Sequence, residues 1–491
     1  MFCFAFLLIC IIFAIRKYFV ISMKSFLPFV VLLFFCTSIL AKVDEAQKIS
    51  YPGGKCYMLR LMLTDKHDTP FNISHPEAYL SQRAIKRRER QNIKVDSTDL
   101  PITPAYLRAI EAKGVKIVGK SRWNNSVLVR SKRSEVVVRL NELPFVKRII
   151  RVFTSPDSIN SSKRANFHKD FNEWDVNNNA YGMSYEQVSS LNGNRLHDAG
   201  YRGRGMMIAV MDGGFMNVDK IPALQAARIV ATTDFVVPRP ADIYKEMDHG
   251  TMVLSTMATN IPNTYIGTAP EASYVLIRCE DEQTESLAEE DYWVEAAEYA
   301  DSIGVDVVNS SLGYHDFDDK TTSHKYSEMD GEQAYISHTA SMLAGKGIVL
   351  VNSAGNDGMG TWKKINFPAD ARDIITVGSV SSNGVNAAFS AVGPTADGRI
   401  KPDVMALGSP ASVITGRGTI INDMGTSFSA PIVCGLVACL WQAMPEKTAF
   451  EIIDLVRMSG NQAGTPDNVY GYGMPDFWKA YKDLSSRRSR R

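Results

Sequence analysis

Two residues that open predicted helices could supply a nucleophile and a base. Ser427 lies in Gly425–Pro431 (GTSFSAP), at the start of a stretch reaching Ala443 that is apolar all round and predicts a buried helix. Backbone N–H groups at a helix start point toward whatever such a serine attacks. His249 lies in the sequence DHGT and opens an apolar helix over Met252–Ala258. Because the helix dipole disfavours a positive histidine at this end, we expect His249 to be a neutral base.

Two further polar residues follow predicted strands. Asp212 comes directly after the run MMIAVM and precedes two glycines, which places a carboxylate at the carboxyl end of a strand. Asn356 lies in AGNDG after the run IVLVN, and its amide could stabilise a developing oxyanion. Taken singly, the aspartate and the asparagine could be turn residues. The histidine and the serine could be helix caps, and Ser429 is a second candidate cap.

Together, the order Asp, His, Asn, Ser resembles that of the subtilisin-like serine protease (subtilase) family. The residues that carry the resemblance are Asp212-Gly213-Gly214, Asp248-His249-Gly250-Thr251, Asn356 and Gly425-Thr426-Ser427-Phe428-Ser429-Ala430-Pro431. In addition, Ser311-Leu312-Gly313 is similar to the strand that pairs with the substrate backbone in this family. The resemblance covers roughly residues 184–480. Two positions depart from the family pattern, since Met252 replaces a second histidine and Gly213 replaces a serine or threonine.

The resemblance implies a secreted serine endopeptidase that hydrolyses peptide bonds through an acyl-enzyme and is made as an inactive precursor. It assigns catalysis to Asp212, His249 and Ser427, the oxyanion hole to Asn356, and substrate binding to Ser311, Leu312 and Gly313. The main alternative is an inactive relative that serves as a binding scaffold, which loss of a triad residue would signal; all three are present. An esterase is a second alternative, but it predicts the order Ser, Asp, His and a Gly-x-Ser-x-Gly turn.

The segments between these motifs predict an α/β catalytic domain over residues 184–485. Short, continuous apolar runs suit parallel strands that are buried on both faces. These runs are Met206–Met211, Tyr274–Ile277, Val305–Asn309, Ile348–Asn352 and Ile374–Val377. Helix-like stretches such as Ser286–Ile303 and Gly331–Ala344 lie between them. This alternation predicts a doubly wound, mostly parallel sheet of the subtilisin-like kind.

Residues 42–165 predict a separate, small α+β domain, and residues 166–183 predict a linker. The domain begins with a basic helix, Arg83–Arg90 (RAIKRRER), which is more typical of a solvated helix face than of a nucleic-acid site. Helix, strand, strand, helix and strand follow at Tyr106–Lys113, Val115–Val118, Val127–Val129, Val136–Leu143 and Val146–Val152. The family resemblance implies that this domain is a removable propeptide, and thus the chain's own intramolecular inhibitor.

The formal net charge of +1 hides two large blocks of opposite sign. Residues 42–165 carry a net charge of +13, residues 166–486 carry −19, and the tail at 486–491 is basic. The two blocks should attract each other strongly at low salt. The near-neutral total gives no sign of a nucleic-acid partner. With 45% hydrophobic and 22% charged residues, the composition excludes collagen, coiled coil and wholesale disorder.

Residues 1–41 predict a signal-peptide region. The apolar runs Phe2–Ile15 and Phe26–Leu40 are each shorter than the roughly 20 residues that span a bilayer. Met23 and a lysine precede the second run and a small residue follows it, so Met23 is the expected start. We therefore expect a secreted or periplasmic (cell-envelope) protein. A membrane anchor built from one or both runs is the less favoured alternative.

No cofactor and no metal site are expected. The acidic stretch Glu280–Asp291 lacks the ligand spacing of a calcium loop and is more typical of a solvated helix start. A structural calcium ion, which the resemblance makes possible, is not evident from the sequence. Seven cysteines are too few for a disulfide scaffold. The expected partners are protein or peptide substrates and the propeptide, with no nucleic acid.

Overall fold

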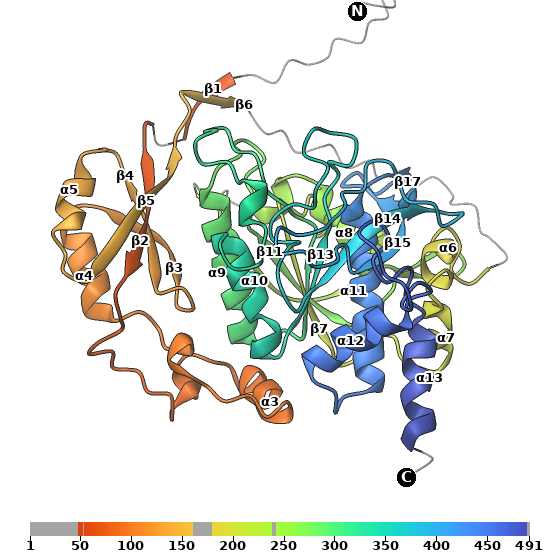
Figure 1. Ribbon diagram of the computed structural model, residues 1–491. Helices are drawn as coiled ribbons and strands as arrows, with labels where there is room; N and C mark the ends of the chain where they lie inside the picture. Colours follow the sequence, from red (N-terminus) through yellow and green to blue (C-terminus); the bar gives the residue numbers. More distant parts are fainter. Residues whose placement is uncertain (1–47, 53, 161–178, 238–241, 489–491) are drawn as a thin grey trace, which may run out of the picture. The chain divides into compact units, whose positions relative to one another are not determined.

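A computed structural model of the chain describes residues 48–52, 54–160, 179–237 and 242–488 (Figure 1). Apart from Lys48, these residues belong to one compact unit, residues 49–491. The predicted signal region 1–41, including Met23, lies outside the described residues. So do residues 166–178 of the predicted linker and the end of the basic tail.

A seven-stranded sheet forms the centre of the larger domain, because its short apolar segments can be buried on both faces. Its strand order is β15-β14-β13-β12-β7-β11-β8, and neighbouring strands run parallel. The strands are β7 (Met207–Asp212), β8 (Arg228–Asp234), β11 (Ser273–Arg278), β12 (Val307–Ser310), β13 (Val349–Ser353), β14 (Ile375–Ser381) and β15 (Val404–Ser409). The five predicted strands and the parallel sheet are confirmed, whereas β8 and β15 escaped prediction.

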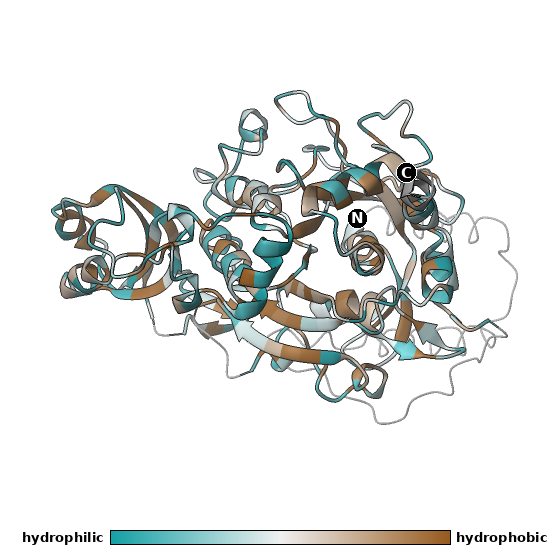
Figure 2. Cartoon of the chain, turned by 90° about the horizontal axis from the view of Figure 1, so that it is seen from below, coloured by the Kyte–Doolittle hydropathy of each residue, from teal (hydrophilic) through white to brown (hydrophobic). Residues whose placement is uncertain are grey.

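Alternate residues of the central strand β7 point into two separate cores, as strand geometry requires. Ile208 and Val210 pack with one group of helices, and Ala209 and Met211 with another. The first group is α8 (His249–Ala258), α11 (Thr426–Ala443), α12 (Ala449–Ser459) and α13 (Phe477–Arg488). The second group is α9 (Ala288–Ile303) and α10 (Tyr335–Met342). Figure 2 shows the brown, apolar residues gathered along the strands and inner helices.

The helix α11 runs through the interior of this domain. Among the described residues it is the one helix long and apolar enough to cross a membrane, but 89% of its apolar window is buried inside the protein. It is therefore a core helix, and Pro431 lies near its first turn, where few backbone donors have helical partners.

The smaller N-terminal domain (residues 54–160) is a four-stranded antiparallel sheet in the order β3-β4-β2-β5. Its elements are β2 (Tyr57–Leu63), α3 (Gln82–Arg90), α4 (Pro104–Ala112), β3 (Lys116–Ser121), β4 (Ser126–Ser131), α5 (Val136–Asn141) and β5 (Val146–Thr154). One sheet face packs on α4 and α5, for example through Leu61 and Ile110. The other face contributes Met58 and Leu128 to the core around α9 and α10. The two domains thus share a core.

The remaining strands and helices are short and join these layers. They are β1 (Lys48–Ser50), β6 (Ser158–Asn160), α6 (Tyr185–Ser189), α7 (Gly193–Asp198), β9 (Asn260–Ile261), β10 (Tyr265–Ile266), β16 (Ala411–Ile414) and β17 (Ile420–Asp423).

Candidate active site

Asp212 and His249 are brought together at the carboxyl end of the sheet. Asp212 is the last residue of β7. The next two strands in the chain, β8 and β11, lie on one side of β7, and β12 lies on the other, so Asp212 ends the strand at which the strand order reverses. His249 is the first residue of α8. The His249 Nδ1 lies 2.9 Å and 3.0 Å from the two carboxylate oxygens of Asp212, which is fully buried. The carboxylate therefore orients the ring and favours a proton on Nδ1.

Ser427 lies across the same cleft, at the second position of α11. Its hydroxyl donates to the Ser311 carbonyl oxygen at 3.4 Å, and the Ser311 hydroxyl donates to the Ser427 carbonyl oxygen at 2.8 Å. Neither bond caps the helix, so the cap alternative does not describe Ser427. The Ser429 hydroxyl instead donates to the Ala406 carbonyl oxygen.

Asn356 is held so that its amide nitrogen is available to the cleft. Its side-chain oxygen accepts hydrogen bonds from both the backbone N–H and the hydroxyl of Thr426, at 3.0 and 2.9 Å. Thr426 is the first residue of α11, directly before Ser427. This pairing fixes which end of the amide is the acceptor, so the Asn356 NH₂ group points away from Thr426 as a donor.

A cleft of about 320 Å³ collects six of the seven predicted site residues, and Asp212 lies buried behind it. The six are His249, Ser311, Leu312, Gly313, Asn356 and Ser427. The departure at Gly213 has a steric reason in this cleft. A Cβ atom there would lie 2.2 Å from the Met247 sulfur and 2.9 Å from a Glu280 carboxylate oxygen. These two side chains thus fill the space that the hydroxyl of a serine or threonine at position 213 would occupy.

The acid–base character of His249 differs from the expectation based on the helix dipole. Burial lowers its pKa, but the charge and hydrogen bond of Asp212 and the charges of Glu280 and Asp248 outweigh burial and raise the pKa to about 9. Around His249, the carboxylates therefore act against the helix dipole and favour the positive ring. The cause is the number of carboxylates around the ring, whose full charges exceed the partial charge of a helix end.

The N-terminal domain contacts α9 through buried ion pairs. Arg60 of β2 binds Asp291 of α9 with two hydrogen bonds of 2.8 and 2.7 Å, and its guanidinium lies 3.7 Å from the centre of the Tyr335 ring. Arg122 bonds the Asp301 carboxylate at 2.7 Å, and its backbone N–H donates to Glu298 at 2.8 Å. A row of carboxylates on one helix thus meets a row of arginines.

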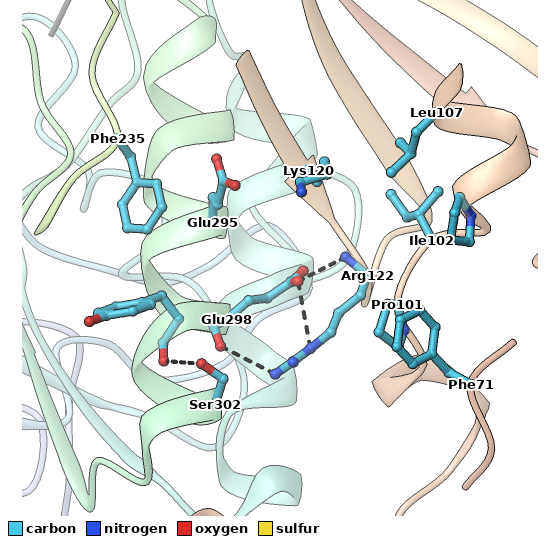
Figure 3. A pocket seen from close by; sticks show the side chains of 12 residues that line it. Phe71, Pro101, Ile102, Leu107, Lys120, Arg122, Phe235, Glu295, Glu298 and Ser302 are labelled. Carbon is cyan, nitrogen blue, oxygen red and sulfur yellow. Dashed lines mark hydrogen bonds and ion pairs between the residues drawn. The ribbon is translucent and has the colours of Figure 1, made fainter. Parts of the chain in front are cut away.

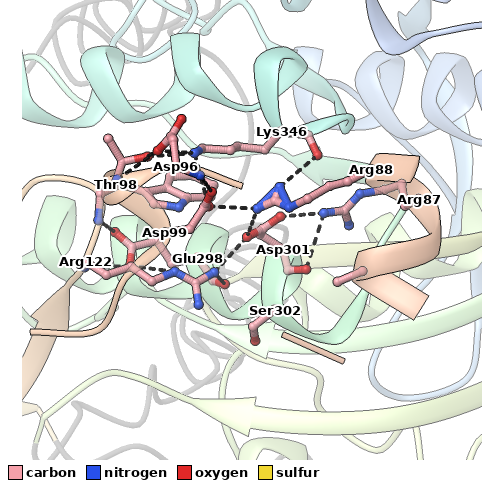
Figure 4. Close-up of polar contacts among 12 residues, drawn as sticks. Arg87, Arg88, Asp96, Thr98, Asp99, Arg122, Glu298, Asp301, Ser302 and Lys346 are labelled. Carbon is pink, nitrogen blue, oxygen red and sulfur yellow. Dashed lines mark hydrogen bonds and ion pairs between the residues drawn. The ribbon is translucent and has the colours of Figure 1, made fainter. Parts of the chain in front are cut away.

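Asp301 is the centre of this network (Figure 4). Its carboxylate accepts from Arg87 and Arg88 of α3 as well as from Arg122. Burial raises the pKa of Asp301, but the three guanidinium groups outweigh it and hold the pKa below its usual range. Arg88 also bonds Asp99 at 2.8 Å. One carboxylate therefore links two separate segments of the N-terminal domain to α9.

These contacts correct two expectations for charged segments. Arg87 and Arg88 are 2% and 1% exposed, so the basic run at 83–90 is not a solvated helix face. The acidic stretch 280–291 is not a solvated helix start either. Glu289 and Glu290 are fully buried, and Glu290 bonds the His324 ring at 2.7 Å. Sequence patterns show charge but not the opposite charges that a distant segment supplies.

A second cavity, of about 370 Å³, lies between the N-terminal domain and α9 (Figure 3). Ile102 and Leu107 line one wall, and Phe235 and Tyr299 line the other. It contains none of the predicted catalytic residues. Across all described residues, no group of three or more His, Cys, Asp or Glu side chains could hold a metal ion.

Comparison with known proteins accounts for both domains. A family described as the subtilase family (Peptidase_S8) matches residues 203–473, which is more than half of the chain. The chain belongs to the subtilase family. A second family, described as the Peptidase S8 propeptide domain of Bacteroidota, matches residues 58–169. The N-terminal domain is therefore a subtilase propeptide domain, packed on a catalytic domain of a family of serine endopeptidases.

Individual relatives of this subtilase are distant. It is 28% identical to Subtilisin NAT of Bacillus subtilis subsp. natto, over 58% of this chain and 68% of that protein. It is 27% identical to Subtilisin-like protease SBT6.1 of Arabidopsis thaliana, over 61% of this chain and 28% of that protein. The same identity and share of this chain hold for the Membrane-bound transcription factor site-1 protease of Rattus norvegicus, of which 27% is covered. The chain thus spans less than a third of the two longer relatives.

Among the cleft residues of this subtilase that escaped prediction from the sequence are Glu280, Asp357 and Asn366. Glu280 was available to the same reasoning as Asp212, because it lies two residues after β11, the parallel neighbour of β7. Asp357 is adjacent to the predicted Asn356. Asn366 carries no local signal, since only the fold brings it to the cleft.

Proposed function

We propose that the chain is a serine endopeptidase made as an inactive precursor, with Asp212, His249 and Ser427 as its catalytic triad. The observation that supports this most strongly is the pairing of a buried carboxylate with His249 Nδ1 at 2.9 Å, in the cleft that holds Ser427. That arrangement leaves the other ring nitrogen, Nε2, to exchange protons with the serine.

In the proposed reaction, Ser427 Oγ attacks the carbonyl carbon of a peptide while its proton passes to His249 Nε2. The carbonyl oxygen becomes an oxyanion, which accepts hydrogen bonds from the Asn356 amide and the Ser427 backbone N–H. As the C–N bond breaks, His249 gives its proton to the leaving amine, and an acyl-enzyme remains. Water then attacks the ester by the same steps and restores Ser427. Asp212 stabilises the positive ring throughout without taking its proton.

An extended peptide would bind beside Ser311, Leu312 and Gly313. These residues follow β12 directly and line the cleft next to Ser427. Backbone hydrogen bonds along such an edge give affinity that tolerates many sequences. We therefore assign substrate binding to this segment.

The propeptide domain is proposed to act as an intramolecular inhibitor until it is removed. Its arginines pair with carboxylates of α9, and both partners are buried where the two domains meet. We also propose a secreted or cell-envelope location, on the basis of the signal-like sequence at 23–41 and the propeptide.

A fluorophosphonate probe tests the proposal directly, because it modifies only an activated serine. We expect labelling of Ser427 in the processed wild-type protein, and none in Ser427→Ala or His249→Ala. The Ser429→Ala variant is the matched control and should be labelled as the wild type is. Absence of label from processed wild-type protein would favour an inactive binding scaffold instead.

A further inference from the structure

The active-site cleft carries two carboxylates that the proposed reaction does not use. Both Glu280 and Asp357 line the cleft, Glu280 close to Met247 near Gly213 and Asp357 directly after Asn356 in the chain. Glu280 makes no hydrogen bond or ion pair with any other described residue. The electrostatic neighbours of Glu280 are Asp212, His249, Glu285 and Arg278.

A buried acceptor without a donor lies next to Asp357. Asn366 is 7% exposed and donates its NH₂ group to the Asp357 carboxylate at 2.8 Å. That bond fixes the orientation of the amide, so its oxygen is the other end, and this oxygen is buried without a hydrogen-bond donor. A buried acceptor left unpaired costs free energy. A substrate that brings a hydrogen-bond donor to the Asn366 side-chain oxygen would remove this cost.

The shape of the cleft assigns these groups to successive substrate residues. The Asn366 amide lies in a slot between Gly313 and Gly355, where a Cβ on either glycine would come within 3.0 Å of Asn366. Because Asn366 lines the same cleft as Ser427 and Asn356, a side chain that enters this slot would belong to the residue whose carbonyl is attacked, P1. Neighbouring side chains of an extended peptide point in opposite directions. The side chain of the preceding residue, P2, would then point the other way, toward Glu280 and His249.

We propose that this cleft selects peptides with a positively charged side chain at both P1 and P2, through Asp357 with Asn366 and through Glu280. A lysine or arginine at P1 would donate to the Asn366 oxygen and lie beside the Asp357 carboxylate. A lysine or arginine at P2 would place its charge beside Glu280. The His315 Nδ1 lies 3.9 Å from an Asp357 carboxylate oxygen, and the His315 ring stacks on Trp362. This inference rests on the proposed peptidase function and specifies its substrate class.

Chromogenic peptide amides with P2-P1 pairs Lys-Arg, Gln-Arg and Lys-Gln separate the two subsites. The first probe, Ser-Ser-Lys-Arg, copies residues 161–164 of the chain. Burial and Asp212 raise the pKa of Glu280 to about 8, so assays at pH 9 keep this carboxylate ionised. For processed wild type we expect kcat/KM for Lys-Arg to exceed that for each singly basic probe by about tenfold or more.

Two variants should each remove one preference and keep the other. Glu280→Gln should reduce the Lys-Arg to Gln-Arg ratio to about one and preserve the Lys-Arg to Lys-Gln ratio, since only one charge pair is lost. Asp357→Asn should do the reverse. Ratios within one variant cancel any effect on His249. Glu282→Gln, an exposed carboxylate two residues from Glu280, is the control and should keep both ratios.

Wild-type protein that cleaves all three probes equally would overturn the inference, as would variants that keep both ratios. In either case, fluorophosphonate labelling of Ser427 would show that the peptidase function stands and only the substrate class is wrong. Absence of both labelling and cleavage would instead overturn the peptidase function, and the inference with it.

Discussion

His249 lies among three carboxylates, and this surrounding determines the pH at which the proposed base can act. Asp212 bonds its ring, and Glu280 and Asp248 add further negative charge. A negative neighbour stabilises the protonated ring and so raises its pKa. Removing such a neighbour must therefore lower the pKa of His249.

We expect kcat/KM on an uncharged peptide to rise with pH through about 9, because His249 must lose its proton to accept that of Ser427. Glu280→Gln should move this rise to lower pH and increase kcat/KM near pH 9, where the wild-type Glu280 carboxylate is ionised. The measurement is a pH–rate profile of wild type, Glu280→Gln and the control Glu282→Gln. A Glu280→Gln profile that coincides with that of wild type would show that Glu280 does not act on His249.

Asn356→Ala should lower kcat by about 100- to 1000-fold, because one donor to the oxyanion is lost. KM should change much less, since the donor acts mainly in the transition state. Steady-state kinetics on one peptide checks both values. The Asn356 side-chain oxygen also accepts a hydrogen bond from the Thr426 hydroxyl. Asn356→Asp keeps this acceptor oxygen and removes only the NH₂ donor. Asn356→Asp should therefore be as slow as Asn356→Ala; normal turnover in either variant would remove Asn356 from the oxyanion hole.

Sequence patterns pointed to the residues with strong local signals, namely those beside glycine turns at strand and helix ends. Asp212, His249 and Ser427 all have such signals, and the fold brings them to one cleft. Asn366 could not be predicted, because its role depends on two glycines 53 and 11 residues earlier in the chain that leave it room. The pKa of His249 also depends on Glu280, which only the fold brings close.

At the scale of elements, α9 is an interface helix whose carboxylates face a second domain. Asp291, Glu298 and Asp301 are each bound by arginine side chains or backbone N–H groups of the propeptide domain. All three are buried. Such pairs add little stability while intact, but losing one partner leaves a buried charge uncompensated.

Arg88→Ala should therefore lower the free energy of unfolding of the uncut precursor by about 3–5 kcal/mol. We would measure this in the Ser427→Ala background by urea denaturation, followed by the fluorescence of the buried interface residue Trp123. Arg90→Ala is the matched control on the same helix, because its side chain is 37% exposed and lies 3.5 Å from Asp306. Its effect should stay below about 1 kcal/mol. Equal losses in the two variants would contradict a special role for the buried pairs.

The element types were predictable where apolar runs are continuous, as in β7 and β13. The central propeptide strand β2 was missed, because Arg60 interrupts its apolar pattern (YMLRLML). That arginine is inward-facing only because Asp291 is there to receive it. The edge strand β8 was missed because its half-exposed sequence has no continuous apolar run.

At the scale of the whole molecule, the opposite charges of the two blocks act at two distances. The net charges of +13 and −19 act over long range and are screened by salt. The pairs around Asp301 are buried, where salt screens much less. The sequence could supply only the first of these, since charge counts do not show which pairs become buried.

Salt should therefore slow association of the cut propeptide with the catalytic domain without releasing it. Between 0.1 and 1 M NaCl we expect the association rate to fall by about tenfold or more. The dissociation rate should change by less than about threefold. Recovery of peptidase activity after dilution of the processed complex measures dissociation, and readdition of the propeptide measures association. A dissociation rate that rises strongly with salt would show that exposed charges hold the complex.

The sharing of Asp301 by three arginines makes the two domains a matched pair. A propeptide domain borrowed from another subtilase would have to bring guanidinium groups to the positions of Arg87, Arg88 and Arg122 at once, or leave this carboxylate buried and bare. Exchange of propeptides between relatives should therefore fail, unless α9 is exchanged with them. The propeptide domain and the catalytic domain of this precursor can then be exchanged only together.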